Sequence, residues 1–168
     1  MVFTMYSQNV IKAGKINHVA AVAKNLEESL KRHHEILGVE PWIIHYFVPP
    51  FHRETYVRER PANYTLKVAI AKMGDIYYEL IEPQEGPSIH KEFLETKGEG
   101  LHHVGRRYNS LEEVKKDLEA FKTKGIKILQ QGMFHGSHYF YLDTEPLIGV
   151  IYEIVYVPLE IKPARIYP

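Results

Sequence analysis

The chain has 168 residues, of which 45% are hydrophobic and 25% charged, and its 21 basic side chains balance its 21 acidic ones. This is the composition of an ordinary globular protein with one domain or two small modules. The balanced charge disfavours binding to nucleic acid, and the lack of cysteine excludes disulfides and Cys-ligated metals. No apolar run approaches the roughly 20 residues that cross a bilayer, and the first residues lack a signal-peptide core. We therefore predict a cytoplasmic protein with no membrane partner.

The first half of the chain begins with a predicted strand over residues 16–23 and a helix over 26–37. Asn25 and Glu28 have the spacing of a capping box, and Gly38 follows the last helical residue. Alternating apolar residues and turn signals then predict three strands and a linking helix, over residues 41–48, 65–73, 75–82 and 88–97.

The second half repeats this order of elements. A strand, a helix and three strands are predicted over residues 101–107, 111–124, 126–131, 137–142 and 149–156. The unit βαβββ thus occurs twice, which predicts an α+β fold with two tandem modules. We assign the first module to residues 14–97, the second to 98–157, and a surface tail to 158–168. The first module carries an extra aromatic insert over 41–64, where two adjacent prolines exclude a central strand.

Two histidines and two glutamates stand at equivalent places of the two modules. His18 in INHVA matches His103 in LHHVG, and Glu79 in IYYELI matches Glu153 in VIYEIV. A duplicated unit brings such residues together across one cleft, where two imidazoles and two carboxylates suit a divalent ion such as Mn, Fe, Co, Ni or Zn. The alternative is a pair of packed histidines and solvent-facing glutamates, but an unpaired carboxylate within an apolar strand is costly. The repeat therefore favours a metal site.

The sequence also resembles the vicinal oxygen chelate, or glyoxalase-type, superfamily. The similarity covers residues 14–157 and is greatest to methylmalonyl-CoA epimerases; it rests on INHVAAVAKNLEESLKRHHEILG, EGPSIHKEFLETKGEGLHH, HGSHYFYLD and GVIYEIV. The resemblance implies that the two modules form a cleft-shaped, eight-stranded mixed sheet, and that the protein is a homodimer. It also implies one divalent metal held by His18, Glu79, His103 and Glu153, with His103 preferred to His102 as the ligand.

The same resemblance implies an isomerase, an epimerase or racemase, that moves a proton at a carbon next to a carbonyl through a metal-stabilised enolate. Glu153 is then the expected base, and Glu79 is the candidate for the opposite face. Three alternatives stay open: a glyoxalase-type lyase on a thiol adduct, a ring-cleaving dioxygenase, and a binding protein that sequesters a small molecule. The complete set of four ligands disfavours the last two.

The expected substrate is a small carbonyl compound, either an acyl thioester or an aromatic ketone. We expect it to contact Trp42, Tyr46, His45 and His135, in segments that border the cleft. The aromatic residues of the insert are equally consistent with a lid or a dimer contact. Two departures from the epimerase pattern disfavour CoA: residues 143–149 read DTEPLIG where the epimerases have a basic residue, and the strand 65–73 lacks the second carboxylate.

Overall fold

The computed structural model describes residues 11–12 and 14–168. Its framework is an open mixed sheet of 11 strands in the order β11-β2-β5-β6-β1-β7-β10-β9-β8-β3-β4. The predicted α+β fold of two βαβββ modules is confirmed, and three strands outside the repeat extend the sheet. Among the described residues, no helix is long and apolar enough to cross a membrane.

The first module supplies one half of the sheet and one outer helix. Its elements are β1 (His18–Val22), α1 (Leu26–Leu37), β2 (Trp42–Phe47), β5 (Leu66–Met73) and β6 (Ile76–Pro83). Helix α1 has the predicted bounds, because the side chain of Asn25 accepts a hydrogen bond from the Glu28 amide and Gly38 adopts a left-handed φ of 66°. The helix packs against this half of the sheet around Leu26 and Leu30.

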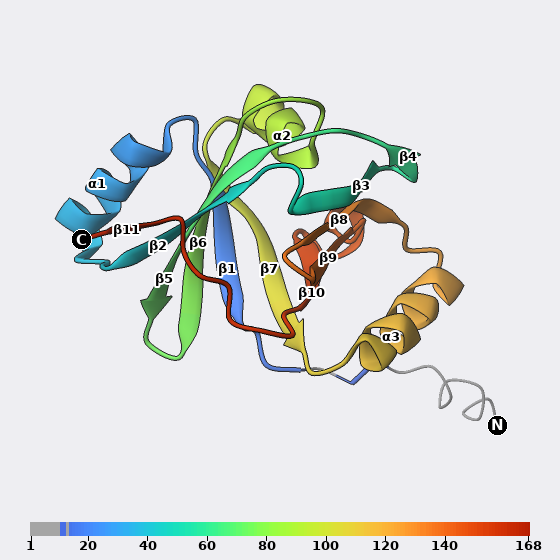
Figure 1. The fold of residues 1–168 in the computed structure, drawn as a ribbon. Helices are drawn as coiled ribbons and strands as arrows, with labels where there is room; N and C mark the ends of the chain where they lie inside the picture. Colours follow the sequence, from blue (N-terminus) through green and yellow to red (C-terminus); the bar gives the residue numbers. More distant parts are fainter. Residues whose placement is uncertain (1–10, 13) are drawn as a thin grey trace.

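The second module repeats this architecture with a second outer helix. Its elements are β7 (Gly100–Tyr108), α3 (Leu111–Thr123), β8 (Ile128–Phe134), β9 (Ser137–Leu142) and β10 (Ile151–Tyr156). Helix α2 (Ile89–Lys97) links the modules, and the short α4 (Glu145–Ile148) precedes β10. Figure 1 shows α1 and α3 on opposite outer sides of the curved sheet. The central strands β1 and β7 pair antiparallel, which joins the modules edge to edge.

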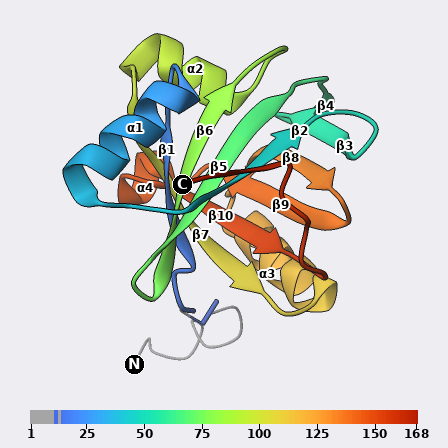
Figure 2. The ribbon, with the colours of Figure 1, turned by 60° about the vertical axis from the view of Figure 1, so that its left-hand side comes forward.

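The insert and the tail form the additional strands. After Pro50 the chain crosses to the other module, where β3 (His52–Val57) pairs with β8 and with the short β4 (Arg60–Pro61). In Figures 1 and 2, β3 and β4 lie at the free edge of β8. The tail passes in front of the sheet to β11 (Arg165–Tyr167), which pairs with β2. The insert and tail therefore border the concave side of the sheet.

Candidate metal centre and cavity

The central strand pair brings the two histidines together. In the β1/β7 register, His18 lies across from Gly105 and His103 lies across from Ala20. A small residue opposite each imidazole leaves space for the ring: a Cβ built on Gly105 would lie 1.9 Å from Cε1 of His18. The two rings meet edge to face with centroids 5.4 Å apart. The sequence repeat thus becomes a geometric one at the centre of the sheet.

The two glutamates approach these histidines from opposite sides. Glu79 on β6 pairs with Ala20, and Glu153 on β10 pairs with Gly105. Because β6 and β10 flank the β1/β7 pair, each carboxylate extends one of the two cross-strand rows that carry the histidines. One possible ligand atom from each of the four side chains lies within 4.8 Å of the others.

The distances within this cluster are those of groups directed at one point. Nε2 of His18 lies 2.7 Å from Oε2 of Glu153 and 3.8 Å from Oε2 of Glu79. Nε2 of His103 lies 3.4 Å from Oε2 of Glu79 and 3.5 Å from Oε2 of Glu153. Despite these short contacts, both Nε2 atoms and Oε2 of Glu153 are buried without an aligned hydrogen bond from the described residues. Buried polar atoms require partners, and this donor set suits a divalent transition metal, so the four residues fit such an ion.

Charge coupling is strong within the cluster. Burial opposes the charged form of His103, but the neighbouring carboxylates of Glu153 and Glu79 outweigh burial and raise its pKa to about 9. Burial would raise the pKa of Glu153, yet the charges of His18 and His103 hold that pKa well below its usual value. Without a metal, His103 and Glu153 therefore attract one another as opposite charges.

The residue that precedes each histidine contacts the back of its ring. Oδ1 of Asn17 lies 3.3 Å from Nδ1 of His18, and Nδ1 of His102 lies 2.9 Å from Nδ1 of His103. A β-bulge in β7 brings His102 beside His103, because Ala20 pairs with His103 while Ala21 pairs with Leu101. When Nε2 of each histidine binds a metal, Nδ1 carries the ring proton and can donate it to the preceding residue.

Helix α2 covers the buried side of this second contact. The ring of His90 lies 4.7 Å from that of His102, and Nε2 of Gln130 donates to Nδ1 of His90 across 3.4 Å. Burial, with the nearby His103, lowers the pKa of His90 to about 3, so its imidazole is neutral. His90, His102 and His103 also place possible ligand atoms within 4.8 Å. The 2.9 Å contact of His102 with His103 is that of a hydrogen bond.

A cavity of about 500 Å³ opens on three residues of the cluster, His18, Glu79 and Glu153. Both modules supply its mostly apolar wall, and Phe47 of β2 stacks on Phe134 of β8 with ring centroids 4.0 Å apart. The edges of the two modules therefore approach one another above the cluster. A concave apolar site with a few polar groups is the usual form of a small-molecule site.

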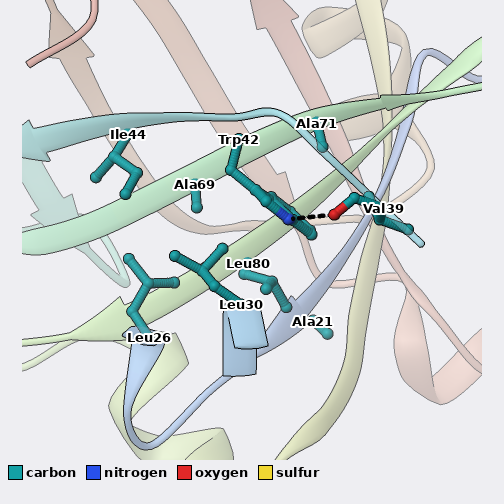
Figure 3. Close-up of a cluster of buried hydrophobic side chains, with 9 residues drawn as sticks. All are labelled: Ala21, Leu26, Leu30, Val39, Trp42, Ile44, Ala69, Ala71 and Leu80. Carbon is teal, nitrogen blue, oxygen red and sulfur yellow. Dashed lines mark hydrogen bonds between the residues drawn. The ribbon is translucent and has the colours of Figure 1, made fainter. Parts of the chain in front are cut away.

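Only one of the four predicted substrate contacts lines this cavity. His45 does so together with its alternate neighbours on β2, and burial lowers its pKa. Trp42 and Tyr46 lie on the other face of β2, since successive side chains of a strand alternate. Figure 3 shows Trp42 in the core against α1, where its indole donates to the Val39 carbonyl across 2.9 Å. His135 lies in the β8–β9 turn and stacks on Phe51 at 4.3 Å.

Most of the other cavity residues were not predicted from the sequence as site residues, among them the polar Ser137 and Tyr141. Tyr141 pairs with Glu153 in the β9/β10 register, and its ring lies 4.9 Å from that of His103. Burial and the two carboxylates hold its pKa well above the usual value, so it remains a hydrogen-bond donor. The alternation of β9 contained this signal, because Ser137 and Tyr141 share one face of the strand.

The sequence matches the Glyoxalase/Bleomycin resistance protein/Dioxygenase superfamily over residues 17–141. The chain therefore belongs to this superfamily, as the resemblance in its sequence indicated. The matched range contains His18, Glu79 and His103, and Glu153 follows it.

Related proteins include methylmalonyl-CoA epimerases. Protein YqjC of Bacillus subtilis, itself uncharacterised, is 27% identical over 144 residues, which are 83% of this chain and 90% of YqjC. Mitochondrial methylmalonyl-CoA epimerase of Mus musculus is 25% identical over 150 residues, or 88% and 76% of the two chains.

Solved structures show the same fold. A hypothetical protein of Bacillus halodurans has a TM-score of 0.65 at 20% identity, with 90% of this chain and 99% of that chain covered. A methylmalonyl-CoA epimerase in complex with methylmalonyl-CoA has a TM-score of 0.60 at 22% identity, with 88% and 97% covered.

Proposed function

We propose that the protein is a divalent-metal-dependent isomerase, an epimerase or racemase that moves a proton at a carbon next to a carbonyl. The observation that carries this proposal is the convergence of His18, Glu79, His103 and Glu153 at an apolar cavity. The relatedness to methylmalonyl-CoA epimerases supports it. A divalent ion held by these four residues supplies a Lewis acid, which makes a proton next to a carbonyl easier to remove.

The side chains have separate tasks in this proposal. The carboxylate of Glu153 accepts the substrate proton, and Glu79 serves the opposite face, because the two carboxylates approach from β10 and β6 on either side of the central strands. Tyr141, which stays protonated beside Glu153, donates a hydrogen bond to a substrate oxygen. The apolar wall excludes water from the reacting carbon.

The test is exchange of a substrate C–H with solvent deuterium, followed by NMR. The substrate panel contains acyl-CoA thioesters, thiol hemiacetals and aromatic ketones with an acidic α-carbon. Glu153→Gln keeps an oxygen ligand but removes the base, so we expect exchange to fall about 100-fold or more, the usual contribution of a positioned base. Metal content should change far less. Exchange at the wild-type rate in this variant would exclude Glu153 as the base.

The ligand set also supports a second candidate function. The set of two histidines and two glutamates is also compatible with a glyoxalase-type lyase that acts on a thiol adduct. Conversion of a thiol hemiacetal without epimerisation of any panel member would favour this lyase over the isomerase.

A further inference from the structure

Two buried polar groups of the cavity wall have no partner within the described protein. His45 is 8% exposed and Ser137 is 6% exposed, and both line the cavity. Nδ1 of His45 and Oγ of Ser137 have no hydrogen-bond partner among the described residues. Buried polar groups that lack a partner lower stability, so two of them on one wall point to a ligand that supplies the missing bonds.

These two groups belong to one end of the cavity. The ring of His45 lies 6.0 Å from that of Phe134, and Ser137 is the register partner of Phe134 in the β8–β9 hairpin. His45 and Ser137 thus come from different modules, and each neighbours Phe134. A ligand oxygen placed beside Phe134 could bond with both.

The charge of the cavity wall is unlike that of a phosphate site. Arg107 is the one Lys or Arg side chain that lines the cavity within the described part of the chain. Its Nη2 already donates to the Val157 carbonyl across 3.0 Å, and the acidic Glu160 lines the same cavity. Polyphosphate groups are bound by several cationic side chains or by clustered backbone amides. A CoA nucleotide therefore finds little complementary charge here.

The C-terminal tail further limits the size of the ligand. Residues 157, 160, 161 and 163 line the cavity, and the tail then continues to β11 at the edge of β2. Figure 1 shows it crossing in front of the sheet between the two modules. A compact molecule fits between this tail and the metal centre more readily than an extended thioester.

We propose that the substrate is an uncharged aromatic or branched-alkyl carbonyl compound with a second oxygen group, which His45 and Ser137 bind. This inference rests on the proposed function, because the carbonyl end is taken to lie at the four-residue cluster. The apolar wall binds the hydrocarbon part of the substrate, and the hydrogen bonds to its second oxygen fix its orientation. CoA thioesters are then poor ligands.

The experiment measures binding by calorimetry to the metal-loaded protein. The probes are phenacyl alcohol, which is an aromatic α-hydroxy ketone, its meta- and para-hydroxy analogues, and propionyl-CoA. We expect one hydroxy analogue to bind about tenfold or more tightly than phenacyl alcohol, the effect of one well-placed hydrogen bond. His45→Leu should abolish this preference and Ser137→Ala should reduce it. His138→Leu is the matched control, because His138 lies on the opposite face of β9 and does not line the cavity.

The inference is wrong if no hydroxy analogue gains affinity, if the gain survives in His45→Leu, or if propionyl-CoA binds as tightly as the best analogue. Its failure is distinct from failure of the proposed function. Binding with the expected preference but without deuterium exchange would contradict only the isomerase. Deuterium exchange confined to propionyl-CoA would contradict only this substrate class.

Discussion

The two modules share their candidate ligands but differ in what surrounds them. His18 has a side chain that is 9% exposed and contacts an amide, whereas His103 is 0% exposed and contacts a second imidazole. Glu79 lies beside Ile70 in the sheet, whereas the equivalent Glu153 lies beside Tyr141. The candidate ligands are therefore the same in the two modules, whereas the residues around them differ. The ligands of the second module, His103 and Glu153, are thus less exposed to solvent than His18 and Glu79. His103 also has the shorter contact behind its ring.

The connections between equivalent strands differ in the same way. The second module joins β8 to β9 by a tight turn, but the first module joins β2 to β5 by residues 48–65, whose strand β3 pairs with β8 of the other module. The insert makes the two halves interdependent, since its side chains pack against the other module. The residues that the two modules share thus lie at the metal centre, and the segments in which they differ lie around it.

The largest expected effect tests whether both modules are needed for the centre. Glu79→Ala removes a candidate ligand of the first module, and His103→Ala removes one of the second. Because each leaves three ligands and a small cavity, we expect loss of retained metal with the fold largely intact. Elemental analysis after gel filtration measures the metal, and circular dichroism measures the fold. Full metal content in both variants would contradict the assigned ligand set.

A smaller effect separates the contacts behind the two histidines. His102→Leu removes the acceptor for Nδ1 of His103, and we expect metal affinity to fall tenfold to a hundredfold, roughly the usual effect of such outer contacts. Asn17→Leu should have less effect, because its contact with His18 is longer at 3.3 Å and less buried. Chelator competition gives the affinities.

The rescue variant His102→Asn provides the control for this comparison. Its side-chain oxygen can occupy the position of Nδ1, so we expect it to recover part of the affinity that leucine removes. The nitrogen chemical shift of Nδ1 of His103 should follow the same order. Equal losses of metal affinity in His102→Leu and Asn17→Leu would mean that His102 and Asn17 contribute equally to orienting the two histidine ligands.

The sequence was sufficient for features that depend on local pattern or on the repeat. The capping residues and terminal glycine give α1 its bounds, and the repeat identified the four residues that converge. It did not identify β3, because His52 pairs with Phe134 in the other module and no local periodicity reports such a partner. Alternation along β2 separates His45 from Trp42 but does not say which face lines the cavity. That choice depends on where α1 packs.

The smallest expected effect concerns the insert. Tyr64 donates a hydrogen bond to the Gln131 carbonyl across 3.0 Å, so it accepts one from Tyr139 at 2.6 Å. Tyr139 in turn accepts from Nε2 of His52 at 2.7 Å, which requires a proton on Nε2 of that imidazole. Burial of this ring, only partly offset by hydrogen bonds to the backbone, lowers its pKa from 6.5 to about 4.

A lowered pKa makes the folded state sensitive to acid, because the unfolded chain binds the proton first. Between pH 7 and pH 5, His52 in the unfolded state becomes protonated while the folded ring stays neutral, which costs about 2 kcal/mol at 1.36 kcal/mol per pH unit. His52→Gln keeps a donor but does not titrate, so its urea-unfolding free energy should fall by about 2 kcal/mol less than that of wild type over this range. His135→Gln replaces an exposed histidine near the insert and serves as the control, and chelator keeps all samples metal-free.

An acid dependence unchanged by His52→Gln would mean that the link between insert and second module does not depend on a neutral His52. Metal affinity should be the same in His52→Gln as in wild type, because the divergent insert, unlike the shared ligands, contributes no group to the metal centre.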